Sequence, residues 1–204
     1  MKPRPSNLLR STSGATAAEF ALVVPVAIAF LLGIIDVGRL MWTWNRAEKA
    51  TQMGVRFAVA TDITPGGLAT YSFVNNGGLP QGSPIPQDKF NGASCTSTGC
   101  TCSSACNWFD NSKTNLGSFN NLVTRMKLLM PEIQAANVRL DYAYSGLGYA
   151  GDPNGPDPVP LVTVRLTGMT PFQPILFSLW GGTISLPDFS ATLTMEDGQG
   201  SVSN

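Results

Sequence analysis

Apolar residues are concentrated at one place near the start of the chain. An uninterrupted apolar run covers residues 20–35, and it is preceded by small residues and a single acid, Glu19. A bilayer hydrocarbon core of about 30 Å is crossed by roughly 20 helical residues, a length that residues 15–35 supply once. The pattern therefore predicts one membrane-spanning helix. Pro25 inside it is tolerated where neighbouring groups satisfy the freed carbonyl.

The helical pattern continues through residues 36–60, which contain neither proline nor a turn cluster. At 100° per residue, one arc collects apolar and small residues, and the opposite side collects basic ones. The first arc holds Val37, Leu40, Met41, Trp44, Ala47, Thr51, Val55 and Ala58, and the second holds Arg39, Arg46, Lys49 and Arg56. We expect one helix of about 45 residues, whose second half packs on a folded domain.

Two acids interrupt this amphipathic segment. Asp36 precedes Arg39 by three residues, a spacing that allows an ion pair on one helix face. Glu48 falls on the apolar arc. It therefore needs a partner from the folded domain or from another subunit, or it marks an edge of the buried face.

Three later segments alternate apolar and polar residues with a period of two. They cover residues 138–144, 162–167 and 189–195. This period with one polar face predicts a one-sided antiparallel sheet. The arc over residues 37–58 is available to cover the apolar face, so the expected fold class is α+β: a long N-terminal helix with a small antiparallel sheet as its head domain.

Turn residues dominate residues 61–115, where we expect short strands around residues 68–74. Ser118 is predicted to cap a helix whose apolar side is Leu122, Val123, Met126, Leu129 and Met130. Residues 172–180 are rich in large apolar side chains, and they form either a short helix that closes the core, which we favour, or a surface patch for a partner subunit.

Residues 146–160 carry three turns at Asp152, Asn154 and Asp157, whose oxygens could hold a cation. The spacing lacks the distal Glu of an EF-hand loop. Turn chemistry alone explains these residues, and we expect no metal site here.

All four cysteines lie in a polar loop, residues 95–106, as Cys95, Cys100, Cys102 and Cys106. An even number of cysteines in an exported region indicates two disulfides. A bond across one residue, between Cys100 and Cys102, is geometrically poor, so two pairings remain open: 95 with 100 and 102 with 106, or 95 with 102 and 100 with 106. A zinc site is the rival interpretation, but the paired C-x2-C knuckles typical of one are absent from the sequence.

Charge and composition exclude several classes of function. The chain has 13 basic and 13 acidic residues, and loss of the basic leader described below would leave an acidic excess, which argues against nucleic acid as a partner. The sequence contains no histidine, the usual general base. We identify no carboxylate pair or nucleophile motif with supporting spacing, so we expect neither an enzyme nor a cofactor.

The order of features at the N-terminus is the reverse of a secretory signal peptide. In a signal peptide, charged residues come first, the apolar region second and the small-residue cleavage site last. Here small residues lie between the basic leader (Lys2, Arg4 and Arg10) and the apolar run. Cleavage at the small residues would remove the charges and keep the helix.

This order resembles the class III leader of type IV pilins, with Gly14 as the last leader residue, Ala15 at position one, Glu19 at position five and Phe20 at position six. The resemblance implies cleavage by a prepilin peptidase after Gly14. It also implies that Glu19 neutralises the new N-terminal amine, that of Ala15, on a neighbouring subunit. Alternatively, Glu19 matters only to the peptidase or rests unpaired at the membrane interface.

Residues 14–60 are similar to the TadE-like family of pseudopilins. The residues that carry the likeness are the leader and apolar helix, then Asp36, Gly38 with Arg39, Asn45, and Gly54 with Arg56 and Ala58. The end of the chain matches loosely through Val162, Val164, Met195 and Glu196. The resemblance implies a pilin-like fold and a minor component of the tight-adherence (Tad, or Flp) pilus machinery.

The expected organisation is a cleaved leader over residues 1–14, a membrane and stem helix over 15–60, and an extracytoplasmic head over 61–204. The expected location is a bacterial inner membrane, crossed once, with the head in the periplasm or outside the cell. Expected partners are the prepilin peptidase, other pilins or pseudopilins and the assembly machinery. Subunit contacts are expected at Ala15, Glu19, Asp36, Arg39 and Glu48. The alternative is a signal-anchored envelope binding protein that holds a metal or ligand in its Cys or Asp loop.

Overall fold

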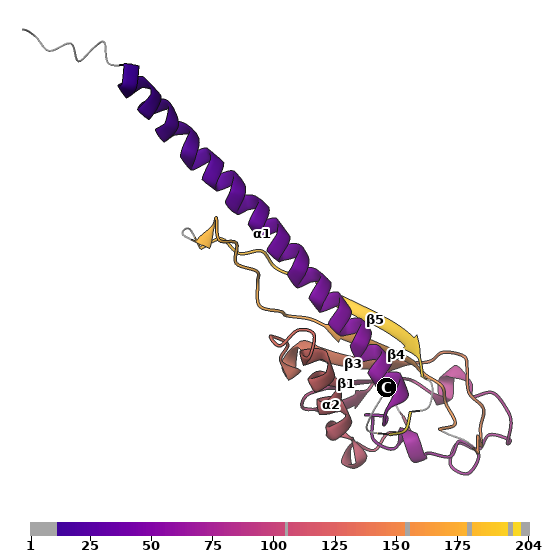
Figure 1. Ribbon diagram of the computed structural model, residues 1–204. Helices are drawn as coiled ribbons and strands as arrows, with labels where there is room; N and C mark the ends of the chain where they lie inside the picture. Colours follow the sequence, from indigo (N-terminus) through magenta and orange to yellow (C-terminus); the bar gives the residue numbers. More distant parts are fainter. Residues whose placement is uncertain (1–11, 105, 154–155, 179–180, 196–197, 201–204) are drawn as a thin grey trace, which may run out of the picture. The chain divides into compact units, whose positions relative to one another are not determined.

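The computed structural model describes residues 12–104, 106–153, 156–178, 181–195 and 198–200. The expected basic leader (Lys2, Arg4 and Arg10), Asn154, Trp180 and Glu196 lie outside these residues. The helices and strands in chain order are α1 (Thr12–Ala60), η2 (Leu68–Thr70), η3 (Gln87–Lys89), β1 (Ala93–Thr96), β2 (Gly99–Cys102), η4 (Asn111–Lys113), α2 (Leu116–Lys127), η5 (Ala135–Asn137), β3 (Val138–Ala143), β4 (Leu161–Leu166) and β5 (Phe189–Thr194) (Figure 1).

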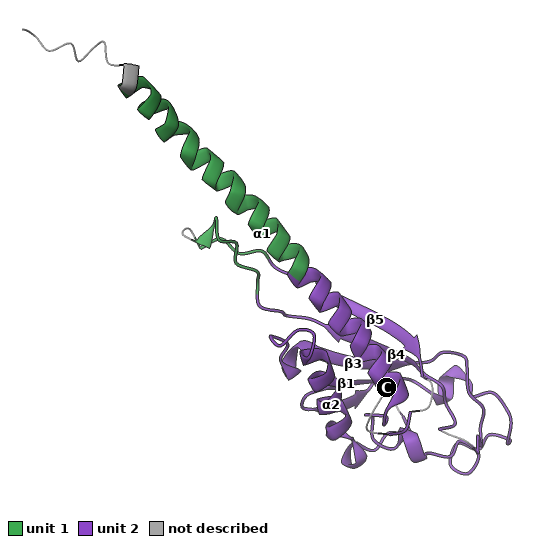
Figure 2. Ribbon diagram, in the orientation of Figure 1, with its two compact units in different colours: residues 1–42, 171–184 green, residues 43–170, 185–204 purple. Residues whose placement is uncertain are grey.

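The chain forms two compact units (Figure 2). Unit 1 comprises residues 1–42 and 171–184, and unit 2 comprises residues 43–170 and 185–204. Helix α1 contributes to both. It is a single helix of 49 residues, slightly longer than the helix of about 45 residues that the sequence pattern predicts. The α+β fold class, with a long N-terminal helix and an antiparallel sheet, is confirmed.

Unit 2 is built on a five-stranded sheet in the order β2-β1-β3-β4-β5, in which every neighbouring pair is antiparallel. The register places Leu140 opposite Val164 and Tyr142 opposite Val162, so their buried side chains share one face. The opposite face is polar, and there the Asp141 carboxylate accepts from the Nε of both Arg139 and Arg165 at 2.8 Å. The predicted one-sided sheet is therefore present.

The last part of α1 joins the core of unit 2 through small side chains. Ala47, Ala50, Thr51 and Gly54 are buried, and they lie one helical turn apart in sequence. A Cβ added to Gly54 would lie 2.9 Å from the Met126 sulfur of α2. Small residues on this face let the helix backbone approach its neighbours closely.

The buried face of α1 begins later than the sequence pattern indicates. Val37, Met41 and Trp44 are exposed, whereas burial in unit 2 begins at Ala47. Helical periodicity identifies a face, but it does not say how far along the helix the covering layer extends. Trp44 still makes an edge-to-face contact with Phe189 of β5, with ring centroids 5.4 Å apart.

Three local predictions are wrong. Residues 68–74 form η2 and turns, not a strand, because Gly67 adopts a left-handed φ of 88° and a Cβ there would meet the Trp108 carbonyl. Strands β1 and β2 instead form around the cysteines. Ser118 does not cap α2: Asn115 does, accepting from the Ser118 N–H at 3.0 Å, while the Ser118 hydroxyl donates to the Asp62 carbonyl.

The third correction concerns residues 172–180. Described residues of this segment belong to unit 1 and form a turn, with Ile175 and Phe177 exposed. They do not close the core of unit 2.

Candidate functional site

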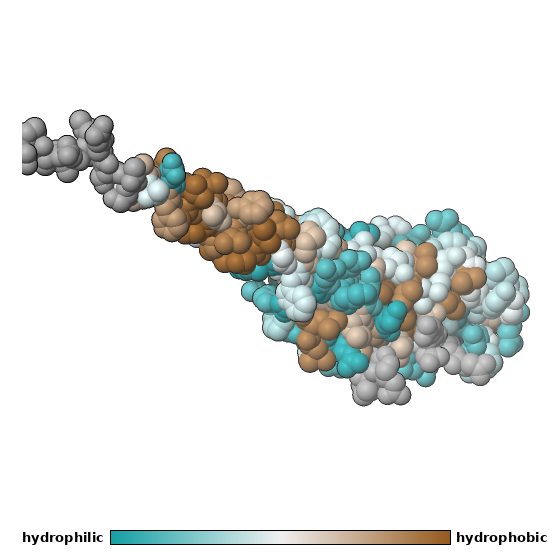
Figure 3. All heavy atoms as spheres, turned by 45° about the horizontal axis from the view of Figure 1, so that its top comes forward, coloured by the Kyte–Doolittle hydropathy of each residue, from teal (hydrophilic) through white to brown (hydrophobic). Residues whose placement is uncertain are grey.

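The first part of α1 presents a large apolar surface to solvent (Figure 3). Its exposed side chains include Phe20 at 70 % and Leu22 at 75 % of their full area, followed by Val23, Val26, Ile28, Phe30, Leu31, Ile34 and Ile35. Within the described residues this is one helix long and apolar enough to cross a membrane. A core helix of a soluble protein would bury such residues, so a membrane or other helices are the environments that suit this surface.

Glu19 lies exposed on the same helix, one turn after Ala15. Residues four apart share a helix face, and the rise between them is about 6 Å. Its carboxylate is therefore the acidic group nearest along the helix to the amine that cleavage after Gly14 would create. The structure brings Gly14, Ala15, Glu19 and Phe20 onto consecutive turns of one continuous helix.

Gly14 has no steric role in the described fold. A Cβ added there meets no heavy atom within 4 Å, and a glycine inside a helix destabilises it by about 1 kcal/mol relative to alanine. Neither packing nor helix stability accounts for a glycine at this position.

Asp36 directly follows the apolar run and is buried within unit 1. Its Oδ1 accepts from the Arg39 Nη1 at 3.0 Å, which agrees with the spacing argument. The same carboxylate also accepts from the backbone N–H of Ile175 at 2.8 Å and of Leu176 at 2.9 Å. The guanidinium of Arg39 lies 5.1 Å from the ring centre of Phe172. Asp36 and Arg39 together hold residues 172–176 against α1.

These contacts to residues 172–176 were missed at the sequence level. The sequence offers two weak signals for them: Asp36 at the end of the apolar run, and the distant apolar segment 172–180. The acceptor and donors are about 140 positions apart in the chain, and backbone N–H groups have no sequence signature.

Arg46 anchors the second part of α1 within unit 2. Its Nε donates to the Leu129 carbonyl at 2.9 Å, and its two terminal nitrogens donate to the Glu132 carboxylate at 3.3 and 3.1 Å. Glu48, in contrast, is exposed and accepts from the Gln52 amide at 3.3 Å. It therefore marks the edge of the buried face and needs no partner from the head.

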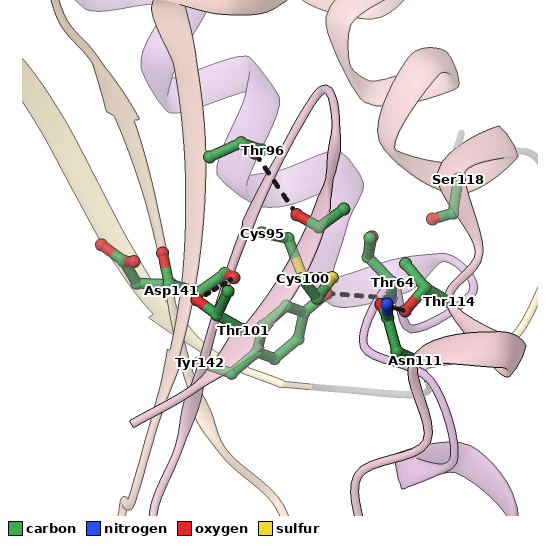
Figure 4. Close-up of a disulfide and its surroundings, with 12 residues drawn as sticks. Thr64, Cys95, Thr96, Cys100, Thr101, Asn111, Thr114, Ser118, Asp141 and Tyr142 are labelled. Atoms are coloured by element: carbon green, nitrogen blue, oxygen red, sulfur yellow. Dashed lines mark hydrogen bonds between the residues drawn. A yellow bond between two sulfur atoms is a disulfide. The ribbon is translucent and has the colours of Figure 1, made fainter. Parts of the chain in front are cut away.

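The cysteine loop contains two disulfides, Cys95–Cys100 and Cys102–Cys106, which is the first of the two pairings left open. The first joins β1 to β2 at directly opposite residues, beside the buried Tyr142 (Figure 4). Burial raises the pKa of the Tyr142 phenol, whose oxygen accepts from the Thr64 N–H at 3.2 Å. The sulfur atoms are thus engaged in cross-links, and the thiolates that the zinc alternative requires are not available.

In the 146–160 loop, the Asp157 carboxylate supports the backbone. Asp157 is buried and accepts from the N–H of Phe73 at 2.8 Å and of Asp152 at 3.2 Å. These bonds agree with the interpretation by turn chemistry.

One comparison with known proteins gives a match, and it falls on the segment just described. Residues 14–56 match the family described as TadE-like protein. This TadE-like segment contains the residues singled out above: Gly14, Ala15, Glu19, Phe20, Asp36, Arg39, Arg46, Glu48 and Gly54. The sheet and the disulfides lie outside it. No curated protein and no solved structure gives a significant match to the chain.

Proposed function

We propose that this protein is a minor pilin-like component, a pseudopilin, of a tight-adherence (Tad) pilus system. The observation that carries the proposal is the exposed apolar helix with Glu19 one turn beyond the Gly14–Ala15 junction. The match of residues 14–56 to TadE-like proteins supports it. The role is structural, and it requires helix and head contacts, not catalysis by this chain.

The first proposed step is processing. A prepilin peptidase hydrolyses the peptide bond between Gly14 and Ala15, which removes the three basic residues of the leader and creates an α-amine at Ala15. The steric freedom at Gly14 supports recognition by a protease, because nothing within the described fold demands glycine there.

The second step is retention in the bacterial inner membrane. Residues 15–35 span about 31 Å as a helix, which matches a hydrocarbon core of about 30 Å. Unit 2 then lies on the periplasmic side. Two disulfides support this placement, since such cross-links form and persist in oxidising compartments.

The third step is assembly by helix bundling. Side chains such as Phe20 and Leu22 would be covered by helices of neighbouring subunits when the protein leaves the lipid. A carboxylate buried among them costs free energy unless it is paired, and the Ala15 amine of a neighbour is the proposed partner of Glu19. Glu48 is free to make a further contact between subunits, whereas Asp36 and Arg39 act mainly within their own chain.

The intact mass of the protein purified from host membranes tests the first step. The expected chain begins at Ala15, and a strain without its prepilin peptidase should yield a chain longer by residues 1–14. A chain that still carries the leader in cells with an active peptidase would contradict the proposal.

A further inference from the structure

The described residues 171–178 and 181–184 form a hairpin attached to α1 within unit 1, named below as the hairpin 171–184. Phe172 and Ile184 exchange two backbone hydrogen bonds of 2.8 Å at its base, and the Gly182 N–H donates to the Phe177 carbonyl at 3.1 Å. The chain therefore reverses between Phe177 and Gly182. Figure 2 shows this hairpin with the first part of α1 in the colour of unit 1.

The hairpin runs toward the apolar run of α1. Phe172 lies over Arg39, and three residues later the Ile175 N–H reaches Asp36. The first half of the hairpin therefore runs antiparallel to α1. Because Asp36 directly follows residues 15–35, Ile175 and Leu176 are held at the level where the proposed membrane span ends.

The hairpin combines large apolar and aromatic residues with an absence of charge. Residues 171–184 contain no Asp, Glu, Lys or Arg, and they include two phenylalanines and a tryptophan. Ile175 is 44 % exposed and Phe177 is 52 % exposed, although both are large apolar side chains. Tryptophan is enriched at the interface between lipid and water, and exposed apolar side chains mark contacts with a partner or a membrane.

Several backbone groups of the described residues near the tip are hydrogen-bonded. Asp36 accepts from the N–H groups of Ile175 and Leu176, and Phe177 accepts from Gly182. An unpaired backbone group is costly in a medium poor in water. By accepting these hydrogen bonds, the Asp36 carboxylate lowers the free-energy cost of moving the N–H groups of Ile175 and Leu176 out of water.

We propose that the hairpin 171–184 inserts its tip, through Ile175 and Phe177, into the headgroup region of the membrane that α1 spans. The partner is a lipid surface, and Asp36 is a positioning residue that aligns this second membrane contact with the end of the span. The inference rests on the proposed function only in assuming that residues 15–35 cross a bilayer.

Depth measurements on the full chain test this proposal. All four cysteines are in disulfides, so a single introduced cysteine can carry an environment-sensitive fluorophore. The label at Phe177→Cys is compared with labels at three reference depths along α1, Leu31→Cys, Ile35→Cys and Trp42→Cys. Each variant is reconstituted at one copy per nanodisc of phosphatidylcholine and phosphatidylglycerol. Quenching is measured with lipids spin-labelled at the headgroup or deep in the acyl chain.

The expected result is that the label at position 177 is quenched by headgroup-labelled lipid as strongly as the label at position 35, and more strongly than the label at position 42. Adding Asp36→Ala should reduce the quenching at position 177 and leave the quenching at position 31 unchanged. One result would overturn the hairpin insertion alone. In it, the label at position 177 is quenched no more than the label at position 42, while the label at position 31 is still quenched by deep-labelled lipid. Loss of deep quenching at position 31 would overturn both the membrane span and the insertion that depends on it. A single copy in each disc excludes a neighbouring subunit as the cause.

Discussion

At the scale of single residues, Glu19 stands out because it places a carboxylate on the apolar segment that is proposed to enter the membrane. A carboxylate in the middle of a bilayer costs about 2.5–3.5 kcal/mol on insertion scales, and less near the interface. We predict that Glu19→Ala reduces pilus formation strongly and that Glu19→Asp, which keeps the charge, reduces it less. Counting pili by electron microscopy measures the effect, and intact mass confirms that processing is unchanged.

Wild-type pilus formation by both variants would remove Glu19 from assembly. If the Glu19→Ala variant accumulated with its leader uncleaved, the loss of pili would result from failed processing and not from failed assembly. In that case the carboxylate serves the peptidase, which is the alternative that the sequence leaves open.

Asp141, on the polar face of the sheet, gives a pH-dependent prediction. Burial alone would raise the pKa of its carboxyl group, but hydrogen bonds from Ser94, Arg139 and Arg165 outweigh burial and hold the pKa below its usual 3.8. The folded state thus binds this proton less readily than the unfolded state. The stabilisation is complete well above pH 3.8 and is lost as the pH falls through the lowered folded-state pKa.

We therefore predict that Asp141→Asn lowers the melting temperature at pH 7 and that its difference from the wild type shrinks toward pH 3. The two ion pairs are partly exposed, so the loss should be no more than about 1 kcal/mol. Thermal unfolding of the full chain in detergent, followed by circular dichroism, measures this difference. Asp88→Asn, at an exposed position, is the charge-matched control, and an equal effect in both variants would count against the proposed role of Asp141.

At the scale of elements, the contact between α1 and α2 depends on Gly54. A Cβ there would lie 2.9 Å from the Met126 sulfur and 3.3 Å from a Leu122 methyl carbon. Both side chains are buried, with little space to move. We predict that Gly54→Leu destabilises unit 2 by about 1–3 kcal/mol, the usual range for overpacking.

Gly33→Leu is the matched control on the same helix, because a Cβ at Gly33 meets no heavy atom within 4 Å. Urea unfolding of unit 2, monitored by tryptophan fluorescence, should shift for the variant at position 54 and stay unchanged for the variant at position 33. Equal midpoints for the two variants would show that α1 does not pack closely at Gly54.

Elements with strong periodicity could be predicted from the sequence, and others could not. Helix α1 and strands β3 to β5 carry regular apolar spacing over many residues, so their type and position follow from the pattern. Strands β1 and β2 consist mainly of Ser, Thr, Cys and Gly. Their pairing depends on β3 and on a disulfide, neither of which leaves a periodic trace in the sequence.

At the scale of the whole molecule, the candidate site shows the same division between local and distant information. The Asp36–Arg39 pair is three residues apart, and its spacing alone predicted it. The hydrogen bonds from Ile175 and Leu176 to Asp36 depend on how the chain returns to α1. The start of the buried face at Ala47, not at Val37, likewise depends on which residues belong to unit 2.

This division of α1 between two units predicts which fragment of the protein folds. The core of unit 2 includes Ala47, Ala50, Val55, Phe57 and Val59 of α1, in one buried cluster with apolar side chains of the sheet. A fragment of residues 43–204 keeps these side chains and leaves out the exposed apolar run. A fragment of residues 61–204 loses them from the buried cluster that also contains Val162, Val164 and Leu166. Each such side chain contributes about 1.5–3 kcal/mol when fully buried.

We therefore expect the 43–204 fragment, produced under oxidising conditions, to be soluble without detergent and to unfold in one cooperative transition. The 61–204 fragment should aggregate or unfold without cooperativity, even with both disulfides formed. Loss of Val55, Phe57 and Val59 alone removes about 4.5–9 kcal/mol, which is comparable to the stability of about 5–15 kcal/mol that is typical of a domain. Size-exclusion chromatography and thermal circular dichroism of the two fragments measure the difference. Cooperative unfolding of the 61–204 fragment at the same temperature as the longer fragment would mean that α1 does not contribute to the core of unit 2. The expected result would show that the helix with the proposed membrane span also completes this core.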